Sequence, residues 1–383
     1  MRPKVCYILR RYDPASAEHL YHVYRFLEGL AQSIDLFVIV ERAAEPPLLQ
    51  GMQRVVVLRG RRPRRLAGMI AAVLRARLAG YRRFYVHYSY AGALTAALLT
   101  RLLGGRVFYW NCGLAHLFFR RWAPTRAALA GKLSGEIPLR LSLRAAHLLV
   151  TGTPAMGAYY TKTFGVSPRR IIILPNEIDL SRFAALPSRA EARGRWGKEE
   201  RPIVLFLHRL SPRKGADLLP AIVARVAAAR PDALFLIGGD GPSRSSIEAA
   251  VAAAGLGRQV VFLGWVPNRD APGLYAAADL YIMPSLEEGA PRVLLEAMAT
   301  GTPFVASDVG GVRDIVPTIA GSWLVPPGDA DRFAGTVITL LARGEVRREL
   351  AAAGREHVRR YDAPVVAGLF LERIVHYGEG DRR

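Results

Sequence analysis

Two glutamates flank a predicted helix start in the C-terminal half of the chain. Glu288 lies in the turn Pro284–Ala290, directly after the apolar run Leu280–Met283, and Glu296 follows eight residues later, inside the predicted helix. A carboxylate accepts hydrogen bonds from the two hydroxyls of a vicinal diol, as found in ribose and hexoses. The pair is therefore predicted to bind neutral, hydroxyl-rich groups, because carboxylates aimed at a phosphate would repel it.

The backbone between the two carboxylates is predicted to bind an anion. Pro291 suits the first position of a helix, so the amides after it would point out of the helix N-terminus toward a phosphate. The strand–loop–helix order places this turn at the carboxyl edge of a parallel sheet, where doubly wound folds bind ligands. The residues predicted to contact the nucleotide here, besides Glu296, are Gly289, Ala290, Arg292, Val293 and Leu294.

A second loop carries cations. Arg209 and Lys214 follow the predicted buried strand Val204–Leu207 and precede Gly215 and the next helix. Two cations at the end of a buried strand can neutralise a diphosphate without a metal. We therefore expect this loop to hold the diphosphate of a ligand whose two sugar rings contact the glutamates.

Each of these features also has a purely structural explanation. Glu296 could pair with Arg292 one helical turn away, Glu288 could be an ordinary turn residue, and the basic loop could simply be solvated. The two carboxylates together, in register with Gly289, favour ligand binding. The Asp-x-Asp sequence that begins at Asp329 is better explained as a helix N-cap, so no metal site is predicted.

Short apolar runs alternate with amphipathic helical patterns along the chain. Such runs are typical of parallel strands covered by helices on both faces, and there are too many for one doubly wound domain. We expect an α/β protein with two Rossmann-like doubly wound parallel-sheet domains facing a cleft. The polar segment Pro175–Pro202 marks the boundary, which gives domains over residues 1–182 and 183–362. Residues 363–383 are predicted to form a helix that packs back on the first domain.

The positive charge is concentrated in the first half. The formal net charge is +21, and no acidic residue lies between Pro46 and Gly135. A one-sided positive field attracts a polyanion, either nucleic acid or an anionic membrane. The segments Arg59–Phe84 and Leu114–Leu133 combine arginines with apolar or aromatic side chains, which favours a bilayer surface. The first segment would also suit a helix packed on its sheet with its arginines in water.

The sequence predicts a protein of a reducing compartment. Its cysteines, Cys6 and Cys112, do not suit a structural disulfide because Cys6 lies in a predicted core strand. The N-terminus has no signal-peptide pattern, and arginines interrupt the most apolar helices. We expect a cytoplasmic protein, peripheral on the inner face of the cell membrane.

These motifs together resemble the retaining glycosyltransferases of the GT-B fold, specifically glycosyltransferase family 4. The resemblance rests on the E-x7-E pair followed by EAMATGTPFVASDVGG (Glu296–Gly311), on the Arg209/Lys214 loop and on LPNEIDLSRF (Leu174–Phe183). It implies transfer of a sugar from a nucleotide-sugar donor, with no other cofactor required. The acceptor it implies is a lipid-linked or cell-envelope glycan at the membrane surface.

The resemblance also implies residue roles. Glu288 would contact the transferred sugar and Glu296 the ribose, while Arg209 and Lys214 would hold the diphosphate as the glycosidic bond breaks. Retention of anomeric configuration would come from front-face attack, with the leaving phosphate taking the acceptor's proton. Such a reaction asks the protein for positioning and anion stabilisation rather than for a nucleophile.

Several positions depart from the family pattern. His208 stands before Arg209 where members have glycine, and Arg10–Leu20 replaces an early glycine pair. Asn111 stands where members often carry a functional histidine, and His116 follows in the same loop. Because this loop comes after a predicted strand, Asn111 and His116 are the predicted catalytic residues on the acceptor side.

Two other functions stay open from the sequence alone. A GT-B scaffold could bind a nucleotide sugar without transferring it, which the departures on the acceptor side allow. A basic nucleic-acid-binding protein would explain the charged half of the chain. No recognisable nucleic-acid-binding module or aromatic platform accompanies that charge, so we expect no nucleic-acid partner.

Overall fold

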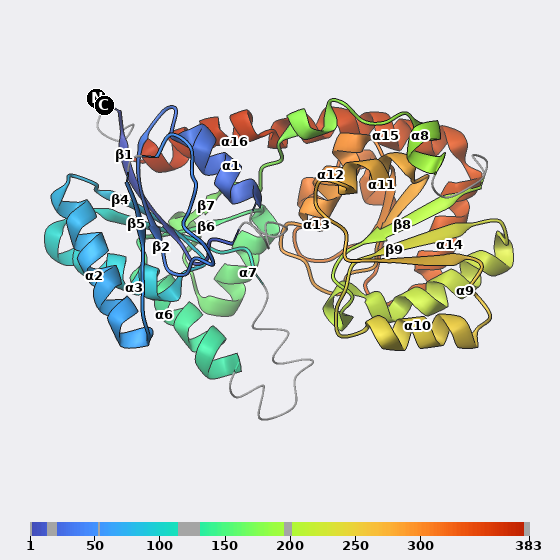
Figure 1. Ribbon diagram of the computed structural model, residues 1–383, viewed down its shortest axis with the longest axis horizontal. Coiled ribbons are helices and arrows are strands. Elements are labelled where there is room, and N and C mark those ends of the chain that lie inside the picture. Colours follow the sequence, from blue (N-terminus) through green and yellow to red (C-terminus); the bar gives the residue numbers. More distant parts are fainter. Residues whose placement is uncertain (1, 14–20, 53, 114–130, 195–200, 379–383) are drawn as a thin grey trace. The chain divides into compact units, whose positions relative to one another are not determined.

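The structure is a computed structural model that describes residues 2–13, 21–52, 54–113, 131–194 and 201–378. The chain divides into two compact units. Unit 1 runs from the N-terminus to Glu177 and includes the segment from Ala363 onward; unit 2 runs from Ile178 to Asp362. Each unit is a parallel sheet covered by helices, which confirms the predicted fold class of two parallel-sheet α/β domains (Figure 1). None of the helices described here combines the length and the apolar character that crossing a bilayer requires.

In the described part of unit 1, seven parallel strands follow the order β3-β2-β1-β4-β5-β6-β7. They are β1 Lys4–Leu9, β2 Asp35–Val40, β3 Arg54–Val57, β4 Arg83–His87, β5 Arg106–Trp110, β6 Leu148–Thr151 and β7 Ile171–Ile173. The inner strands are almost wholly buried because helices cover both faces of the sheet, whereas the edge strand β3 is half-exposed.

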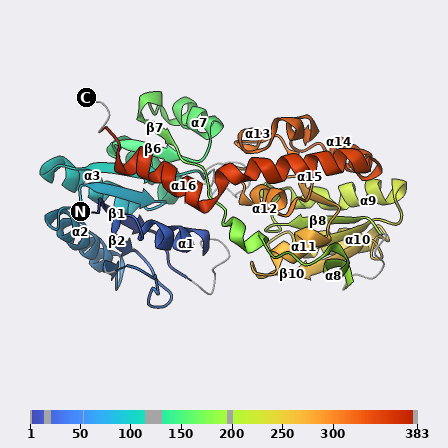
Figure 2. The same ribbon diagram turned by 90° about the horizontal axis from the view of Figure 1, so that it is seen from above.

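The helices of unit 1 form two layers. They are α1 Tyr21–Leu30, α2 Arg62–Leu78, α3 Tyr90–Leu103, α6 Ile137–Ala145, α7 Pro154–Phe164 and α16 Ala363–Phe370. The helical turn Lys132–Glu136 leads into α6, and α3 packs between α2 and α6. Helix α16, although it comes from the end of the chain, packs beside α1 (Figure 2), where the rings of Phe26 and Phe370 lie 5.9 Å apart.

In the described part of unit 2, six parallel strands follow the order β10-β9-β8-β11-β12-β13. They are β8 Ile203–Leu207, β9 Leu234–Gly238, β10 Val260–Gly264, β11 Leu280–Met283, β12 Phe304–Ser307 and β13 Leu324–Val325. The helices are α8 Arg189–Arg193, α9 Leu219–Ala229, α10 Arg244–Ala253, α11 Ala271–Ala277, α12 Arg292–Thr300, α13 Val312–Ile315, α14 Ala330–Ala342 and α15 Gly344–Val358.

Two glycines hold the loops of unit 2 together at the carboxyl edge of its sheet. Gly215 has φ +65°, and a Cβ atom there would lie 1.8 Å from the carbonyl oxygen of Pro284. Gly310 has φ +54°, and a Cβ atom there would lie 1.7 Å from the carbonyl oxygen of Glu288. Because only glycine permits such approaches, the loops after β8, β11 and β12 converge on one another.

Candidate active site

The centre of the site is an ion pair between two loops of unit 2. Strands β8 and β11 are neighbours in the sheet, so the loops that follow them lie side by side. Lys214 on the first loop and Glu288 on the second meet with Nζ and Oε1 2.8 Å apart. Both side chains are buried, with 8% of Lys214 and 6% of Glu288 exposed. The two loops are also joined through the backbone, since the carbonyl of Arg213 accepts the amide of Leu286 at 2.9 Å.

Glu288 Oε1 accepts from two further donors. The hydroxyl of Ser285 donates to it at 2.8 Å, and Nε2 of His208 lies 3.4 Å away. Nδ1 of His208 accepts the amide of Arg209 at 2.8 Å, which assigns the proton of the neutral ring to Nε2. The structure records no donor from the described residues to Glu288 Oε2. This oxygen is therefore the one available to a ligand hydroxyl.

The charges around this carboxylate decide its ionisation. Burial alone would raise the pKa of Glu288, but the charge of Lys214 and the hydrogen bonds from His208 and Lys214 outweigh burial and hold the pKa well below its usual range. Burial, with the charge of Lys214, lowers the pKa of His208 to about 4. Burial also lowers the pKa of Lys214, against the opposing charge of Glu288. At neutral pH, Glu288 is thus a fixed anion beside a neutral imidazole.

Glu296 lies two turns into α12 and is half-buried. Burial raises the pKa of its carboxyl, while the charges of Arg292 and Arg182 and a hydrogen bond with Tyr275 act in the opposite direction. Arg182 belongs to the segment Leu174–Phe183 that the sequence analysis singled out. The charge of Arg182 therefore acts on Glu296, so this segment lies within electrostatic range of α12.

The start of α12 differs by one residue from the prediction. Pro291 is the N-cap rather than the first helical residue, no side chain caps the helix, and the amide of Leu294 bonds the carbonyl of Pro291 at 3.3 Å. The carbonyl of Gly289 accepts the amide of Gly311 at 3.1 Å, which ties this turn to the loop after β12. Gly289, Ala290, Arg292 and Val293 are half-buried at this edge of the sheet.

Arg209 follows His208 on the loop that carries Lys214. Its side chain is exposed, and the structure records no hydrogen bond or ion pair between its guanidinium group and any described residue. Lys214 on the same loop already pairs with Glu288, whereas the guanidinium group of Arg209 has no recorded partner among the described residues. Arg209 is therefore available to an anionic ligand.

On the other unit, Asn111 follows β5 and is buried. Its Nδ2 donates to the hydroxyl of Tyr109 at 3.0 Å, and its Oδ1 accepts from the amide of Gly113 at 3.1 Å and from the hydroxyl of Tyr160 at 2.6 Å. These bonds indicate that Asn111 positions its loop, and a catalytic role for it stays a prediction. His116, the other predicted residue on the acceptor side, lies outside the described residues, as does most of the segment Leu114–Leu133.

Among the described residues, no three His, Cys, Asp or Glu side chains gather as a metal site would require. The carboxylate of Asp329 accepts the amide of Arg332 at 2.9 Å, so it caps α14. Cys6 and Cys112 are buried free thiols.

Two family models match consecutive parts of the chain. "Glycosyltransferase Family 4" matches residues 21–182, and "Glycosyl transferases group 1" matches residues 188–357. A D-inositol 3-phosphate glycosyltransferase of Mycobacterium sp. (strain KMS) is 30% identical over 355 residues, which cover 86% of this chain and 77% of the relative.

The chain belongs to glycosyltransferase family 4.

Further relatives match over a shorter stretch of sequence, whereas solved structures match over nearly the whole chain. The 2-deoxystreptamine glucosyltransferase of Streptomyces kanamyceticus is 37% identical over 243 residues, 62% of each chain. Matches to the first three curated relatives span 62%, 55% and 42% of their lengths. The structure of Anabaena HepE in complex with UDP is 20% identical, has a TM-score of 0.77, and covers 96% of this chain and 98% of that one. The architecture is thus the GT-B fold of these glycosyltransferases.

Two residues that contact Glu288 were not predicted from the sequence of this family-4 chain. His208 and Ser285 both contact Glu288, and neither received a role from the sequence. His208 directly follows β8, and Ser285 lies two residues past the end of β11, so the signal that could have found them is the adjacency of those two strands. Sequence alone does not give strand order within a sheet.

Proposed function

We propose that this protein is a retaining glycosyltransferase that moves a sugar from a nucleotide-sugar donor to a lipid-linked or cell-envelope glycan acceptor. Unit 2 takes the donor and unit 1 the acceptor. The observation that carries the proposal is the buried Lys214–Glu288 pair. On the same loop as Lys214, the exposed Arg209 has no recorded side-chain partner among the described residues, and none of them donates to Glu288 Oε2. HepE was solved in complex with UDP, which supports a nucleotide as part of the ligand.

The roles follow from charge and exposure. Arg209 and the remaining N–H groups of Lys214 bind the diphosphate, helped by the backbone from Gly289 to Val293, since the amide of Leu294 already bonds the carbonyl of Pro291. Glu288 Oε2 accepts from a hydroxyl of the transferred sugar. Glu296 holds the ribose through its carboxylate.

The acceptor hydroxyl attacks the anomeric carbon on the face from which the diphosphate leaves. The carbon–oxygen bond to the phosphate breaks as the new glycosidic bond forms, and the hydroxyl proton passes to the leaving phosphate oxygen. The protein supplies cations for the charge that develops on this oxygen, and no protein nucleophile is needed.

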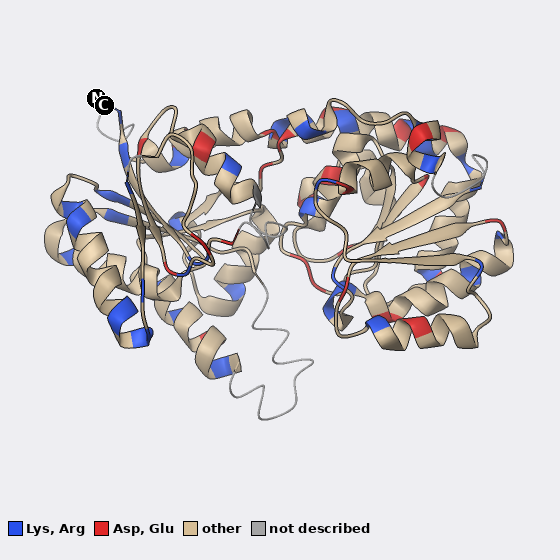
Figure 3. Cartoon of the chain, viewed as in Figure 1, with Lys and Arg blue, Asp and Glu red and all other residues tan. Residues whose placement is uncertain are grey.

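An exposed apolar surface supports a membrane-proximal acceptor. Among the described residues, twelve large apolar side chains are exposed, and nine of them lie on α2, α3 and residues 132–145, which we call the three-helix face. They are Leu66, Ile70, Leu78, Leu98, Leu102, Leu103, Leu133, Ile137 and Leu141. Helices α2 and α3 carry arginines and no acidic residue (Figure 3).

Apolar side chains among arginines on neighbouring helices suit the headgroup region of an anionic bilayer. We therefore propose peripheral attachment of the three-helix face to the inner face of the cell membrane. The relatives named above act on a cyclitol or a cyclitol phosphate by their names, which supports a hydroxylated ring as the group that receives the sugar.

The test is transfer from a panel of UDP-, GDP-, ADP- and dTDP-sugars to a membrane extract, followed by NMR assignment of the new anomeric centre. We expect one donor to be consumed and its anomeric configuration to be kept. Inversion of configuration would contradict the retaining mechanism. Donor hydrolysis without any transfer, or no consumption of any donor, would contradict the proposed reaction.

A further inference from the structure

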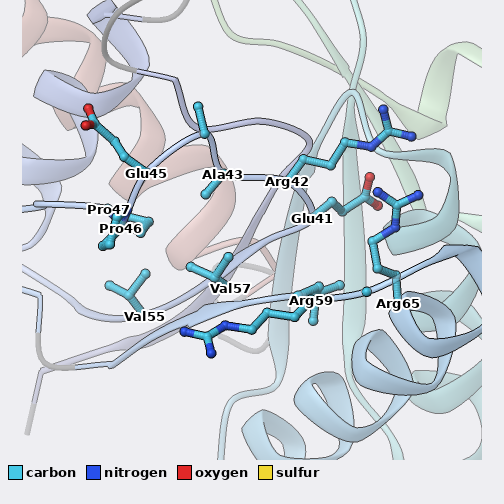
Figure 4. A pocket seen from close by; sticks show the side chains of 13 residues that line it. Glu41, Arg42, Ala43, Glu45, Pro46, Pro47, Val55, Val57, Arg59 and Arg65 are labelled. Carbon is cyan, nitrogen blue, oxygen red and sulfur yellow. The ribbon is translucent and has the colours of Figure 1, made fainter.

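Unit 1 contains a pocket that is lined by none of the predicted site residues. It has a volume of about 710 Å³ and lies where β2 and β3 end (Figure 4). Residues 41–47 follow β2, residues 55–60 hold the end of β3 and its loop, and α2 contributes one side chain. Because all strands of this sheet are parallel, the pocket shares the carboxyl edge of the sheet with the Asn111 loop. It therefore lies on the edge where doubly wound folds bind ligands.

Three arginines line the pocket: Arg42, Arg59 and Arg65. The first two are exposed and the third is half-buried. The structure records no hydrogen bond or ion pair between their guanidinium groups and any described residue. Guanidinium groups bind phosphate through paired hydrogen bonds, and three of them around one cavity form an anion-binding arrangement.

The carboxylates of the pocket do not cancel this charge. Glu41 accepts a hydrogen bond from the hydroxyl of Ser89, which also caps α3. This bond holds the side chain of Glu41 in place. Glu45 is the second carboxylate and is exposed. Two carboxylates against three guanidinium groups leave a net positive pocket, in a unit with no acidic residue from Pro46 to Gly135. Both carboxylates can still accept hydrogen bonds from the hydroxyl groups of a ligand.

Part of the pocket wall is apolar. Val55 and Val57 belong to the half-exposed edge strand β3, and Leu58 and two prolines complete this wall. An apolar wall beside charged groups fits the carbon face of a ring whose substituents are polar. The lining as a whole matches a ring that carries both hydroxyl groups and a phosphate.

We propose that this pocket binds the phosphate of the acceptor, a phosphorylated sugar or polyol. The proposal rests on the proposed function, since it takes the ligand to be the group that receives the sugar. The phosphate can belong to a free phosphate ester or to the headgroup of a lipid, because both present the same anion. The three arginines select against a cationic ring.

The first experiment compares ring ligands that differ in charge. Binding of glucose 6-phosphate, glucose and glucosamine to the full chain is measured by calorimetry, for the wild type and for Arg42→Gln and Arg59→Gln. We expect wild-type binding of the phosphate ester only, weakened about ten-fold or more by either substitution. Arg82→Gln is the matched control, because Arg82 is exposed at the amino end of β4, on the opposite edge of the sheet.

The second experiment separates the two sources of phosphate. Flotation uses vesicles of phosphatidylcholine with phosphatidylinositol, against phosphatidylcholine alone. Loss of flotation in Arg59→Gln but not in Arg82→Gln supports a lipid headgroup in the pocket. Calorimetric binding of glucose 6-phosphate that is lost in Arg59→Gln, with flotation unchanged, supports a free phosphate ester. If neither binding responds to Arg42→Gln or Arg59→Gln more than to Arg82→Gln, the proposal is overturned.

Two controls separate this proposal from the donor site. Arg209→Gln, which removes an exposed side chain of unit 2, should leave the binding of glucose 6-phosphate to the pocket unchanged. Loss of this binding in Arg209→Gln would assign the phosphate to unit 2 and overturn the proposal. A shift in the melting temperature with UDP, GDP, ADP or dTDP reports the donor site in every variant. Absence of any such shift counts against the proposed function, whereas a normal shift with unaltered phosphate binding in Arg59→Gln counts against the pocket alone.

Discussion

Lys214 Nζ and Glu288 Oε1 lie 2.8 Å apart, and both side chains are more than nine-tenths buried. The pair joins the loops after two adjacent strands and occupies the place where the proposed diphosphate and sugar meet. Removing one member of a buried ion pair leaves the other charge without compensation. Before any ligand arrives, each residue thus keeps the other in its charged form and in position.

The first prediction concerns stability. Lys214→Met should lower the free energy of unfolding by about 3–5 kcal/mol, because Glu288 is then buried without its cation. Adding Glu288→Gln should recover part of that loss. Urea denaturation of both variants measures this, with Lys162→Met as the control, since Lys162 is exposed near the end of α7. A loss for Lys214→Met no larger than that of the control would contradict the structural account.

Substitution of Arg209 should behave differently, because no residue that the structure describes pairs with its guanidinium group. Arg209→Gln should leave the melting temperature nearly unchanged and weaken nucleotide binding about ten-fold or more, as loss of a charge-assisted bond does. Arg258→Gln is the control, because Arg258 is exposed before β10, at the amino edge of the same sheet, and this substitution should change neither property. Equal nucleotide affinity of Arg209→Gln and the wild type would exclude Arg209 from the diphosphate site.

Substitutions of Glu288 and Glu296 should weaken the binding of different ligands, because each residue contacts a different part of the donor. Glu296→Gln should weaken UDP or another nucleoside diphosphate about ten-fold, through the lost ribose contact. Glu288→Gln should affect the complete nucleotide sugar more than the nucleoside diphosphate, because only the sugar reaches Oε2. Calorimetry with both ligands measures the difference, and the reverse ranking would contradict the assignment.

The pH dependence of stability should carry a contribution from His208. Its pKa is about 4 in the folded protein, below the ordinary value of 6.5, so the unfolded chain binds the proton first as the pH falls. Stability is therefore lost as the pH drops from about 6.5 to about 4, by at most about 3 kcal/mol. His208→Gln should show a shallower fall over this window in urea melts. Parallel curves for the two proteins would show that the imidazole is not held neutral.

Membrane binding should depend on apolar side chains of the three-helix face. Leu78→Gln with Leu102→Gln should reduce flotation with anionic vesicles, since both leucines are exposed there, by 77% and 73%. Leu48→Gln removes an equally exposed leucine outside the three-helix face and should not reduce it. Equal losses in both variants, or equal recovery of the wild type from neutral vesicles, would contradict the proposal.

The sequence predicted the parts of the site that are encoded locally. The apolar run Leu280–Met283 is strand β11 with the predicted bounds. Period, burial and turn chemistry are properties of neighbouring residues, so they can be read from the chain. The sequence placed Lys214 and Glu288 on loops that follow buried strands of one half of the chain, but the ion pair between them was not predicted.

Other parts depend on contacts between distant segments. His208 and Ser285 both reach Glu288 because β8 pairs with β11, and Asn111 accepts a hydrogen bond from Tyr160 of the distant helix α7. The three-helix face and the arginine-lined pocket likewise need the order of β1 to β7 and the packing of α3 between its neighbours. The sequence pattern contains no information on strand order, so these features required the structure.

Binding of a nucleotide at the Lys214–Glu288 site is tested by the melting temperatures of the wild type and Lys214→Met with UDP, GDP, ADP and dTDP. We expect at least one nucleotide to raise the melting temperature of the wild type and Lys214→Met to lose most of this rise. No rise with any of the four nucleotides, or an equal rise in the variant, would contradict it.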